Sequence, residues 1–265
     1  MKPSKVCNLR QEAASIISNS EVMPGTYLMW LESPLIAPLA KPGQFVMVRC
    51  GDYQLRRPLS IHLVDDQNRL ALLFTVVGKG THWLSQRQAG DNLDLLGPLG
   101  NGYSIHPASR NLLLVAGGIG IAPLHFLAQK ALKQGYSVTL LLGAQTATQL
   151  YPRHLLPPEA ELVFATEDGS AGEKGMITDL LPDFLGWADQ LFACGPTSMY
   201  RTMAKSKKLL NTKPAQVSLE MRMGCGRGIC YGCTLKTKSG LKQVCKDGPV
   251  FELKDVLWDE LAYDD

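Results

Sequence analysis

The chain has 265 residues, of which 45% are hydrophobic and 19% charged, and its formal net charge is +3. This length suffices for two domains and a small appendage, and so mild a charge gives no reason to expect nucleic acid or an anionic membrane as a partner. No apolar run reaches the roughly 18 residues of a membrane-spanning helix, and the first residues lack the apolar core of a signal peptide. We therefore expect a cytoplasmic protein.

Up to about residue 105 the sequence indicates β structure. Short apolar runs are separated by Gly, Pro and Asp, which favour turns, and their spacing suits a small antiparallel barrel. The expected strands include 27–30, 44–48, 70–77 and 92–95, and segment 97–102 is expected to be a loop between domains.

Two short motifs in this part suit a flavin. Arg56 and Arg57 begin a predicted strand, where an arginine fork suits a phosphate, and Ser60 follows at a distance that lets it reach a flavin ring nitrogen. Gly78-Lys79-Gly80-Thr81 follows a strand and offers backbone N–H groups to a second phosphate. Each motif alone is weak, because paired surface arginines are common and the second motif also suits a plain hairpin turn.

From about residue 110 to 215 strand-like and helical segments alternate. This pattern is typical of an open parallel sheet with helices on both faces. The expected strands are 112–116, 138–142, 162–165 and 191–193, the expected helices are 123–134, 175–183 and 196–208, and a last strand at 216–220 should close the sheet.

Two glycine turns in this second part suggest a nucleotide site. Gly117-Gly118-Ile119-Gly120 leads from a strand into a helix, and exposed N–H groups at a helix start bind pyrophosphate. The usual dinucleotide fingerprint is incomplete, because Pro123 replaces the third glycine and no acidic residue ends the second strand. Cys194-Gly195-Pro196 forms another turn after a later strand. Since the carboxyl ends of adjacent parallel strands face one crevice, the two turns together favour a nucleotide.

Four of the seven cysteines lie close together near the end of the chain. Cys225, Cys230 and Cys233 have the C-x4-C-x2-C spacing of plant-type [2Fe–2S] ferredoxins, and Cys245 supplies a fourth thiolate. The glycines between them let backbone N–H groups approach the sulfurs. A hairpin turn at 238–240 would bring Cys245 back. Structural zinc is the alternative, although zinc ribbons usually show a second C-x2-C knuckle, which is missing here.

These motifs occur together and in this order in one family. Over essentially its whole length the chain resembles the electron-transfer subunits of class 1B dihydroorotate dehydrogenases, within the ferredoxin-reductase superfamily. The segments 218–223 and 244–251 around the cysteines resemble this subunit more than reductases in general. The matching cofactor motifs are Arg57-Pro58-Leu59-Ser60, Phe74-Thr75-Val76 and Gly80-Thr81 for the flavin, and the turn containing Gly118 and Gly120 together with Cys194-Gly195-Pro196 for the nicotinamide.

The resemblance implies an antiparallel FAD-binding barrel (1–107), a parallel-sheet NAD-binding domain (108–216) and a small [2Fe–2S] domain (217–265). It also implies an FMN-containing catalytic subunit as partner, which oxidises dihydroorotate to orotate in pyrimidine biosynthesis, in a heterotetramer with two copies of each subunit. Arg227 departs from the family, which usually has a small or apolar residue between the two glycines.

A flavin must lie between the other two centres, because a cluster moves single electrons and nicotinamide takes a hydride. The expected order is therefore partner FMN, cluster, FAD and NAD⁺, with no side chain acting as a general acid or base. We expect structural roles for His62 and His82. One alternative is a flavin/iron–sulfur subunit of another redox complex, such as a ferredoxin:NAD(P) oxidoreductase or a hydrogenase. Another is a regulatory module that binds zinc.

Overall fold

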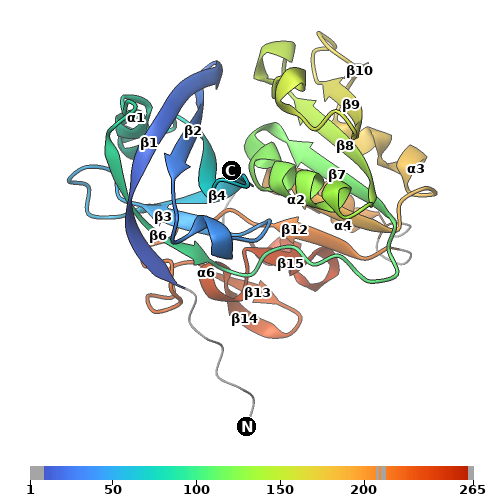
Figure 1. Cartoon of the computed structure of the whole chain (residues 1–265). Coiled ribbons are helices and arrows are strands. Elements are labelled where there is room, and N and C mark those ends of the chain that lie inside the picture. Colours follow the sequence, from blue (N-terminus) through green and yellow to red (C-terminus); the bar gives the residue numbers. More distant parts are fainter. Residues whose placement is uncertain (1–8, 207–208, 210–212, 262–265) are drawn as a thin grey trace.

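A closed antiparallel barrel forms the first part of the chain (Figure 1). The computed structural model describes residues 9–206, 209 and 213–261. The barrel strands follow the order β1-β2-β5-β4-β3-β6, and the runs predicted as strands fall on β2, β3, β5 and β6. Their bounds are β1 (Arg10–Met23), β2 (Thr26–Glu32), β3 (Phe45–Val48), β4 (Arg57–Val64), β5 (Arg69–Thr75) and β6 (Asn92–Leu99).

Two local predictions for the barrel were wrong. The loop predicted at 97–102 starts only at Gly100, because Leu99 still pairs with Phe45 of β3. The hairpin turn considered for Gly78-Lys79-Gly80-Thr81 is instead the start of helix α1 (Lys79–Ser85), with Gly78 as its N-cap. The Thr81 hydroxyl accepts hydrogen bonds from the N–H groups of Val77 and Gly78, so the sequence forms a capped helix start.

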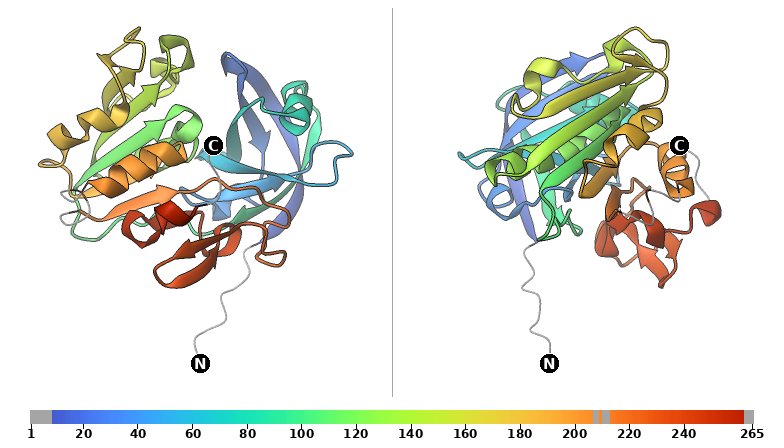
Figure 2. Two further views of the ribbon diagram at one scale, coloured as in Figure 1. Left: turned by 180° about the vertical axis from the view of Figure 1, so that it is seen from behind. Right: turned by 90° about the vertical axis from the view of Figure 1, so that its right-hand side faces the viewer.

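The second part is a seven-stranded sheet in the order β10-β9-β8-β7-β11-β12-β15. Neighbouring strands from β10 to β12 are parallel, and β15 is antiparallel to β12. Helices α2 and α4 cover opposite faces, as the views from in front and behind show (Figure 2). The bounds are β7 (Asn111–Gly117), β8 (Ser137–Ala144), β9 (Glu161–Thr166), β10 (Glu173–Lys174), β11 (Gln190–Cys194), β12 (Ala215–Ser218), β15 (Val250–Glu252), α2 (Ile121–Lys133), α3 (Leu181–Phe184) and α4 (Thr197–Lys205).

The helix predicted at 175–183 is interrupted. It consists of a 3-10 turn, η5, followed by the single turn α3, in which Pro182 lacks a backbone N–H and so fits only the first turn. The helix predicted at 196–208 ends at Lys205 as α4, and its positions 207 and 208 lie outside the described residues. The 3-10 turns are η1 (Ala37–Leu39), η2 (Gly118–Gly120), η3 (Ala147–Gln149), η4 (Arg153–Leu155), η5 (Ile177–Leu180), η6 (Leu253–Asp255) and η7 (Trp258–Glu260).

The cysteine-rich segment lies beneath both larger parts (Figure 1). It contains the hairpin β13 (Thr234–Thr237) and β14 (Gly240–Gln243), which confirms the predicted turn, and then α6 (Val244–Asp247). The segment then adds β15 to the edge of the central sheet, beside β12. The predicted strand at 216–220 is β12, which therefore does not end the sheet. The domain limits 107/108 and 216/217 stay predictions, and the second falls within β12.

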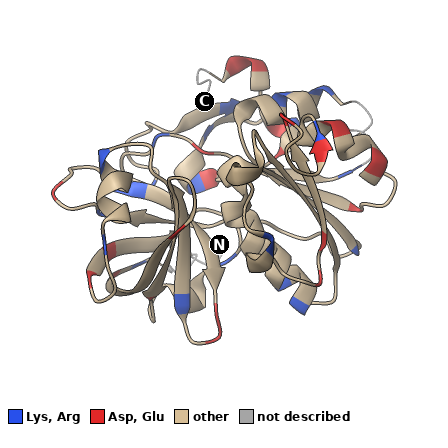
Figure 3. Ribbon diagram, turned by 90° about the horizontal axis from the view of Figure 1, so that it is seen from above, with Lys and Arg blue, Asp and Glu red and all other residues tan. Residues whose placement is uncertain are grey.

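One cluster of buried side chains joins all three parts. It contains Met47 and Leu99 of the barrel, Val115 of the sheet, and Cys233 and Cys245 of the last segment. Positive and negative residues are interspersed along the chain as seen from above (Figure 3). In the part of the chain that the structure describes, every helix is too short or too polar to cross a lipid bilayer.

Candidate functional site

The cysteine loop is shaped by glycines. Gly226 and Gly228 have φ angles of +67° and +75°, which side chains with a Cβ rarely adopt. Cys225 and Cys230 lie in this loop, Cys233 directly precedes β13, and Cys245 lies in α6. Cys233 and Cys245 are buried, whereas Cys230 is exposed.

Backbone N–H groups point at the cysteine sulfurs. The N–H groups of Arg227 and Ile229 donate to Cys225 Sγ at 3.4 and 3.3 Å, and that of Gly228 donates to Cys245 Sγ at 3.1 Å. Burial opposes ionisation of Cys225, but these hydrogen bonds outweigh it and lower the pKa of the thiol to about 6. Burial and the adjacent Cys233 instead raise the pKa of Cys245 to about 12. A bound metal ion would deprotonate such a thiol outright.

Backbone hydrogen bonds link the cysteines in two pairs. The Cys230 N–H donates to Cys225 Sγ at 3.5 Å, and the Cys245 N–H donates to Cys233 Sγ at 3.4 Å. A [2Fe–2S] cluster needs two ligands for each iron. The pairing and the N–H groups therefore fit a [2Fe–2S] cluster.

The cysteine loop rests on the barrel. A Cβ added to Gly226 would lie 2.6 Å from Met47 Cγ, so the loop backbone packs directly on β3. Met47 is the cross-strand partner of Pro58 in β4. From the other side, the Asn101 side chain donates to the carbonyls of Lys246 and Asp247 at 3.1 and 2.9 Å. The segment around Cys245 is thereby tied to the loop that follows β6.

The residues predicted to hold the flavin come together at one end of the barrel. Arg57, Pro58, Leu59 and Ser60 are half-buried on β4, and Phe74 and Thr75 end β5, with Val76 next. Gly80 and Thr81 lie in the first turn of α1. A Cβ on Gly80 would be 2.7 Å from Arg57 Nε, so the Arg57 side chain packs directly against the start of α1.

The two adjacent arginines have different environments. Arg56 forms an ion pair with Asp94 of β6, and its guanidinium also donates to the Asp94 carbonyl at 2.9 Å. Arg57 donates to the Leu55 carbonyl at 2.7 Å, and the structure shows no acidic partner for it among the described residues. Arg56 is therefore held by the barrel, and the predicted phosphate contact of this motif stays a prediction for Arg57.

The two nicotinamide-side turns meet as predicted. Strand order reverses between β7 and β11, so the ends of these strands flank the switch point at which open sheets bind ligands. A Cβ on Gly120 would lie 1.9 Å from the Cys194 carbonyl oxygen, and one on Gly195 would lie 3.1 Å from Gly117 Cα. Only glycine fits such close approach. Gly118 is exposed there, with a φ of +54°.

Glu220 was not predicted as a site residue, although it lies beside this junction. Burial, then the nearby Glu220 carboxylate, raise the pKa of the Cys194 thiol to about 12. The Tyr200 hydroxyl accepts from the Gly195 N–H at 2.8 Å and donates to the Ser218 carbonyl at 2.6 Å, which fixes the turn to β12. Glu220 follows β12 by two residues, and only the sheet order brings it near Cys194.

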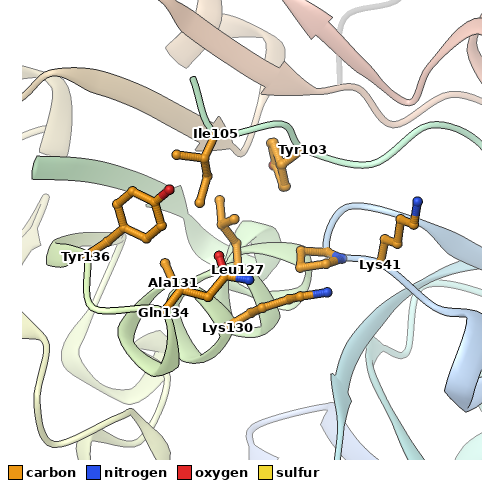
Figure 4. A pocket seen from close by; sticks show the side chains of 9 residues that line it. Lys41, Tyr103, Ile105, Leu127, Lys130, Ala131, Gln134 and Tyr136 are labelled. Carbon is orange, nitrogen blue, oxygen red and sulfur yellow. The ribbon is translucent and has the colours of Figure 1, made fainter. Parts of the chain in front are cut away.

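A cavity of about 250 Å3 opens at the other end of α2 (Figure 4). It lies between the loop before β3, the interdomain segment and the later turns of α2. The lining includes none of the residues predicted to bind cofactors, so this cavity is separate from both nucleotide regions. It is lined by Lys41, Pro42, Tyr103, Ile105, Leu127, Lys130, Ala131, Gln134 and Tyr136.

Comparison with known proteins identifies the family. Residues 220–257 match the iron–sulfur cluster binding domain of dihydroorotate dehydrogenase B. The chain is 42% identical over 257 residues to the electron transfer subunit of dihydroorotate dehydrogenase B (NAD(+)) from Desulforamulus reducens, covering 93% of this chain and 98% of the relative. The chain belongs to the family of dihydroorotate dehydrogenase B electron transfer subunits. The subunit from Bacillus caldolyticus is 38% identical, with the same coverage of both chains.

Solved structures agree with this family's fold. A chain of the NADH-dependent reduced ferredoxin-NADP oxidoreductase, described for flavin-based electron bifurcation, superposes with a TM-score of 0.86 at 33% identity, covering 94% of this chain and 91% of that chain. The ferredoxin reductase of carbazole 1,9a-dioxygenase superposes with a TM-score of 0.66 at 18% identity, covering 77% and 66%, which shows the fold alone. The barrel, parallel sheet and cluster segment predicted from the sequence are confirmed.

Proposed function

We propose that this chain carries electrons from the FMN of a dihydroorotate-oxidising catalytic subunit to NAD⁺, through its own [2Fe–2S] cluster and FAD. One observation carries the proposal: the cysteine loop packs at Gly226 on Met47, and Met47 pairs with Pro58 of the flavin motif. The cluster loop and the flavin strand are thus neighbours, as electron transfer between their cofactors requires. FAD supplies the exchange between one-electron and two-electron chemistry.

The chain's own residues bind and orient these groups. Arg57 would bind a flavin phosphate, while Ser60 and the turn at Gly80-Thr81 orient the rest of the flavin. Gly118, Gly120 and Cys194-Gly195-Pro196 would bind NAD(H) at the sheet's switch point, with Glu220 beside them. The remaining proposed contacts are Pro58 and Leu59, together with Phe74-Thr75-Val76 along the flavin, and the cluster ligands Cys225, Cys230, Cys233 and Cys245.

The catalytic subunit would dock over the cluster. Ile229 and Tyr231 flank Cys230 and are 68% and 70% exposed, which is unusual for large apolar side chains. A partner that covers them brings its FMN close to the cluster. We infer a heterotetramer with two copies of each subunit, located in the cytoplasm where pyrimidines are made.

Replacing Cys245 by Ser tests this order of centres. The variant should lose or damage the cluster, because Cys245 is the one cysteine that the sequence offers after Cys233. NADH reduction of artificial two-electron acceptors through FAD should survive, whereas electron exchange with the FMN subunit should collapse. Both activities are measured on the same flavin-loaded preparation.

Cys50→Ser provides the matched control, since Cys50 is also buried but lies in the barrel, far along the chain from the cluster ligands. It should retain both activities. Loss of both activities in Cys245→Ser, with both retained in Cys50→Ser, would show that the cluster chiefly stabilises the fold. Retention of both would place the cluster off the electron path and contradict the proposal.

A second candidate function comes from the structural match at 33% identity. The matched chain belongs to a ferredoxin-NADP oxidoreductase, so this chain would then serve a different redox complex. Co-purification separates the two candidates. An FMN protein that binds orotate supports the dehydrogenase, and a partner that reduces ferredoxin instead supports the oxidoreductase.

A further inference from the structure

His62 lies at the contact between the barrel and the sheet domain. It lies two residues after Ser60 on β4, where the pairing of β4 with β5 is irregular between Ile61 and Leu63. Ile61 packs in the barrel core, whereas the His62 ring faces α2 and bonds to the Ala122 carbonyl. His62 has no exposed surface, because α2 packs against β4 at this point.

Three hydrogen bonds fix the His62 ring. Its Nδ1 lies 2.9 Å from the Ala122 carbonyl oxygen, and its Nε2 lies 3.0 Å from the Tyr151 hydroxyl and 3.1 Å from His125 Nδ1. A carbonyl oxygen only accepts, so His62 Nδ1 carries the proton and Nε2 is the acceptor. Nε2 has a single lone pair, for which the Tyr151 hydroxyl and His125 Nδ1–H are the two neighbouring donors.

The cluster of three rings is neutral and shielded from water. His125 and Tyr151 are each 3% exposed. The rings meet edge to face, with centroid distances of 4.8 Å for His62 and His125 and 5.4 Å for His62 and Tyr151. Burial lowers the pKa of His125 to about 4 and, with the neighbouring His125, holds the pKa of His62 well below its usual range. Both histidines thus stay uncharged at neutral pH.

The hydrogen bond to Ala122 joins two parts of the proposed site. β4 bears the flavin motif, and Ala122 lies in the first turn of α2, directly after the glycine turn that ends at Gly120. Helix α2 also spans both cores, since Phe126 packs in the barrel cluster and Leu124 in the sheet cluster. The His62 ring thereby fixes the start of α2 against the flavin strand.

We propose that His62 is a positioning residue for hydride transfer, which it serves by holding the nicotinamide-side turn at a fixed place against the flavin strand. The inference rests on the proposed function, in which NADH and FAD react between these elements. The His62 ring has no exposed surface with which to meet a cofactor. It acts through the Ala122 carbonyl, and reacting atoms must approach to about 3–3.5 Å, where an error of about 1 Å costs roughly a hundredfold in rate.

The test compares variants of the full chain loaded with FAD and cluster. His62→Leu removes both ring nitrogens, whereas His62→Asn keeps an N–H donor near the position of Nδ1. The readouts are the rate of FAD reduction at saturating NADH, by stopped-flow absorbance, and the charge-transfer absorption between reduced flavin and NAD⁺, which reports their stacking. Ile61→Val is the matched control, because it loosens the same strand on the barrel side only.

We expect His62→Leu to slow FAD reduction about tenfold to a hundredfold and to weaken the charge-transfer band, with flavin content and cluster spectrum unchanged. His62→Asn should recover most of the rate, and Ile61→Val should match the original chain. A His62→Leu rate within twofold of the original would overturn the inference and leave the proposed function standing. Failure of the unaltered chain to reduce FAD with NADH would overturn both.

If His62→Leu does not fold, Tyr151→Phe decides the question. It removes one donor to Nε2 and keeps the ring in place. The expected result is slower FAD reduction, by roughly twofold to tenfold, in a protein with full flavin content. An unchanged rate in Tyr151→Phe would then refute the positioning role.

Discussion

At the scale of single residues, the adjacent Arg56 and Arg57 have different environments, because segments distant in the sequence supply their partners. Arg56 is bound by Asp94 of β6, whereas Arg57 lies on Gly80 at the start of α1. The two residues alone could not be told apart in the sequence, because nothing local reveals which of them faces an acidic side chain. The cysteine ligands were different, because their short spacing alone predicts a cluster loop.

Arg57→Ala should weaken FAD retention by about 1.5–3 kcal/mol, the usual contribution of a hydrogen bond to a charged group. Flavin remaining after dialysis is measured by absorbance. The matched control is Arg49→Ala, which removes a largely exposed arginine that bonds to Asp94 and lies outside the flavin motifs. Full flavin content in the Arg57 variant would show that Arg57 is not a flavin ligand.

At the scale of elements, backbone hydrogen bonds join the turn after β9 to the end of β8. Glu167 N–H donates to the Ala144 carbonyl at 3.1 Å, and Asp168 N–H donates to the Gln145 carbonyl at 3.2 Å. Hydrogen bonds from Ser170 lower the pKa of the Asp168 carboxyl, which is therefore charged. The turn after β9 thus brings an acidic residue beside the end of β8, where the sequence has none.

We predict that NADH is preferred to NADPH, because Asp168 repels a 2′-phosphate and no Arg or Lys follows β8 until Arg153. Asp168→Asn should reduce this preference by up to about fivefold, a small effect because the charge is exposed and screened by solvent. Steady-state kcat/KM with each cofactor measures it. Asp183→Asn on α3 serves as the control. Equal use of NADPH by the original chain would contradict the prediction.

Elements with a strong local pattern were predictable, and those made by long-range pairing were not. β7, β8 and α2 were found because apolar periodicity and a glycine turn mark them. β15 is a three-residue strand, Val250–Glu252, and only its pairing with β12 makes it part of the sheet. The structural role expected for His62 is confirmed by its hydrogen bonds. Its partners His125 and Tyr151 lie far along the chain and gave no local signal.

At the scale of the whole molecule, the barrel and the sheet domain meet through neutral histidines. In the unfolded chain these histidines take up protons below about pH 6.5. In the folded chain His125 does so only near pH 4. The unfolded state therefore binds more protons between these values, and stability falls as the pH drops from about 6.5 towards 4.

The free energy of unfolding should thus decrease from pH 7.5 to 5.5, and His125→Gln should lose about 1.4 kcal/mol less over this interval. Urea titrations followed by circular dichroism at both pH values measure the difference. His82→Gln, at an exposed histidine on α1, is the control for the loss of an imidazole elsewhere in the chain. Equal pH dependence in the His125 variant would show that this histidine does not contribute.

The position of β15 has a consequence for how the chain is made. On the ribosome β12 emerges well before β15, so the growing sheet has an open edge until the residues after Cys245 appear. Open sheet edges invite pairing with other chains. Residues 245–252 carry both Cys245, the last proposed cluster ligand, and β15. One short stretch of polypeptide would therefore complete both the cluster site and the sheet edge.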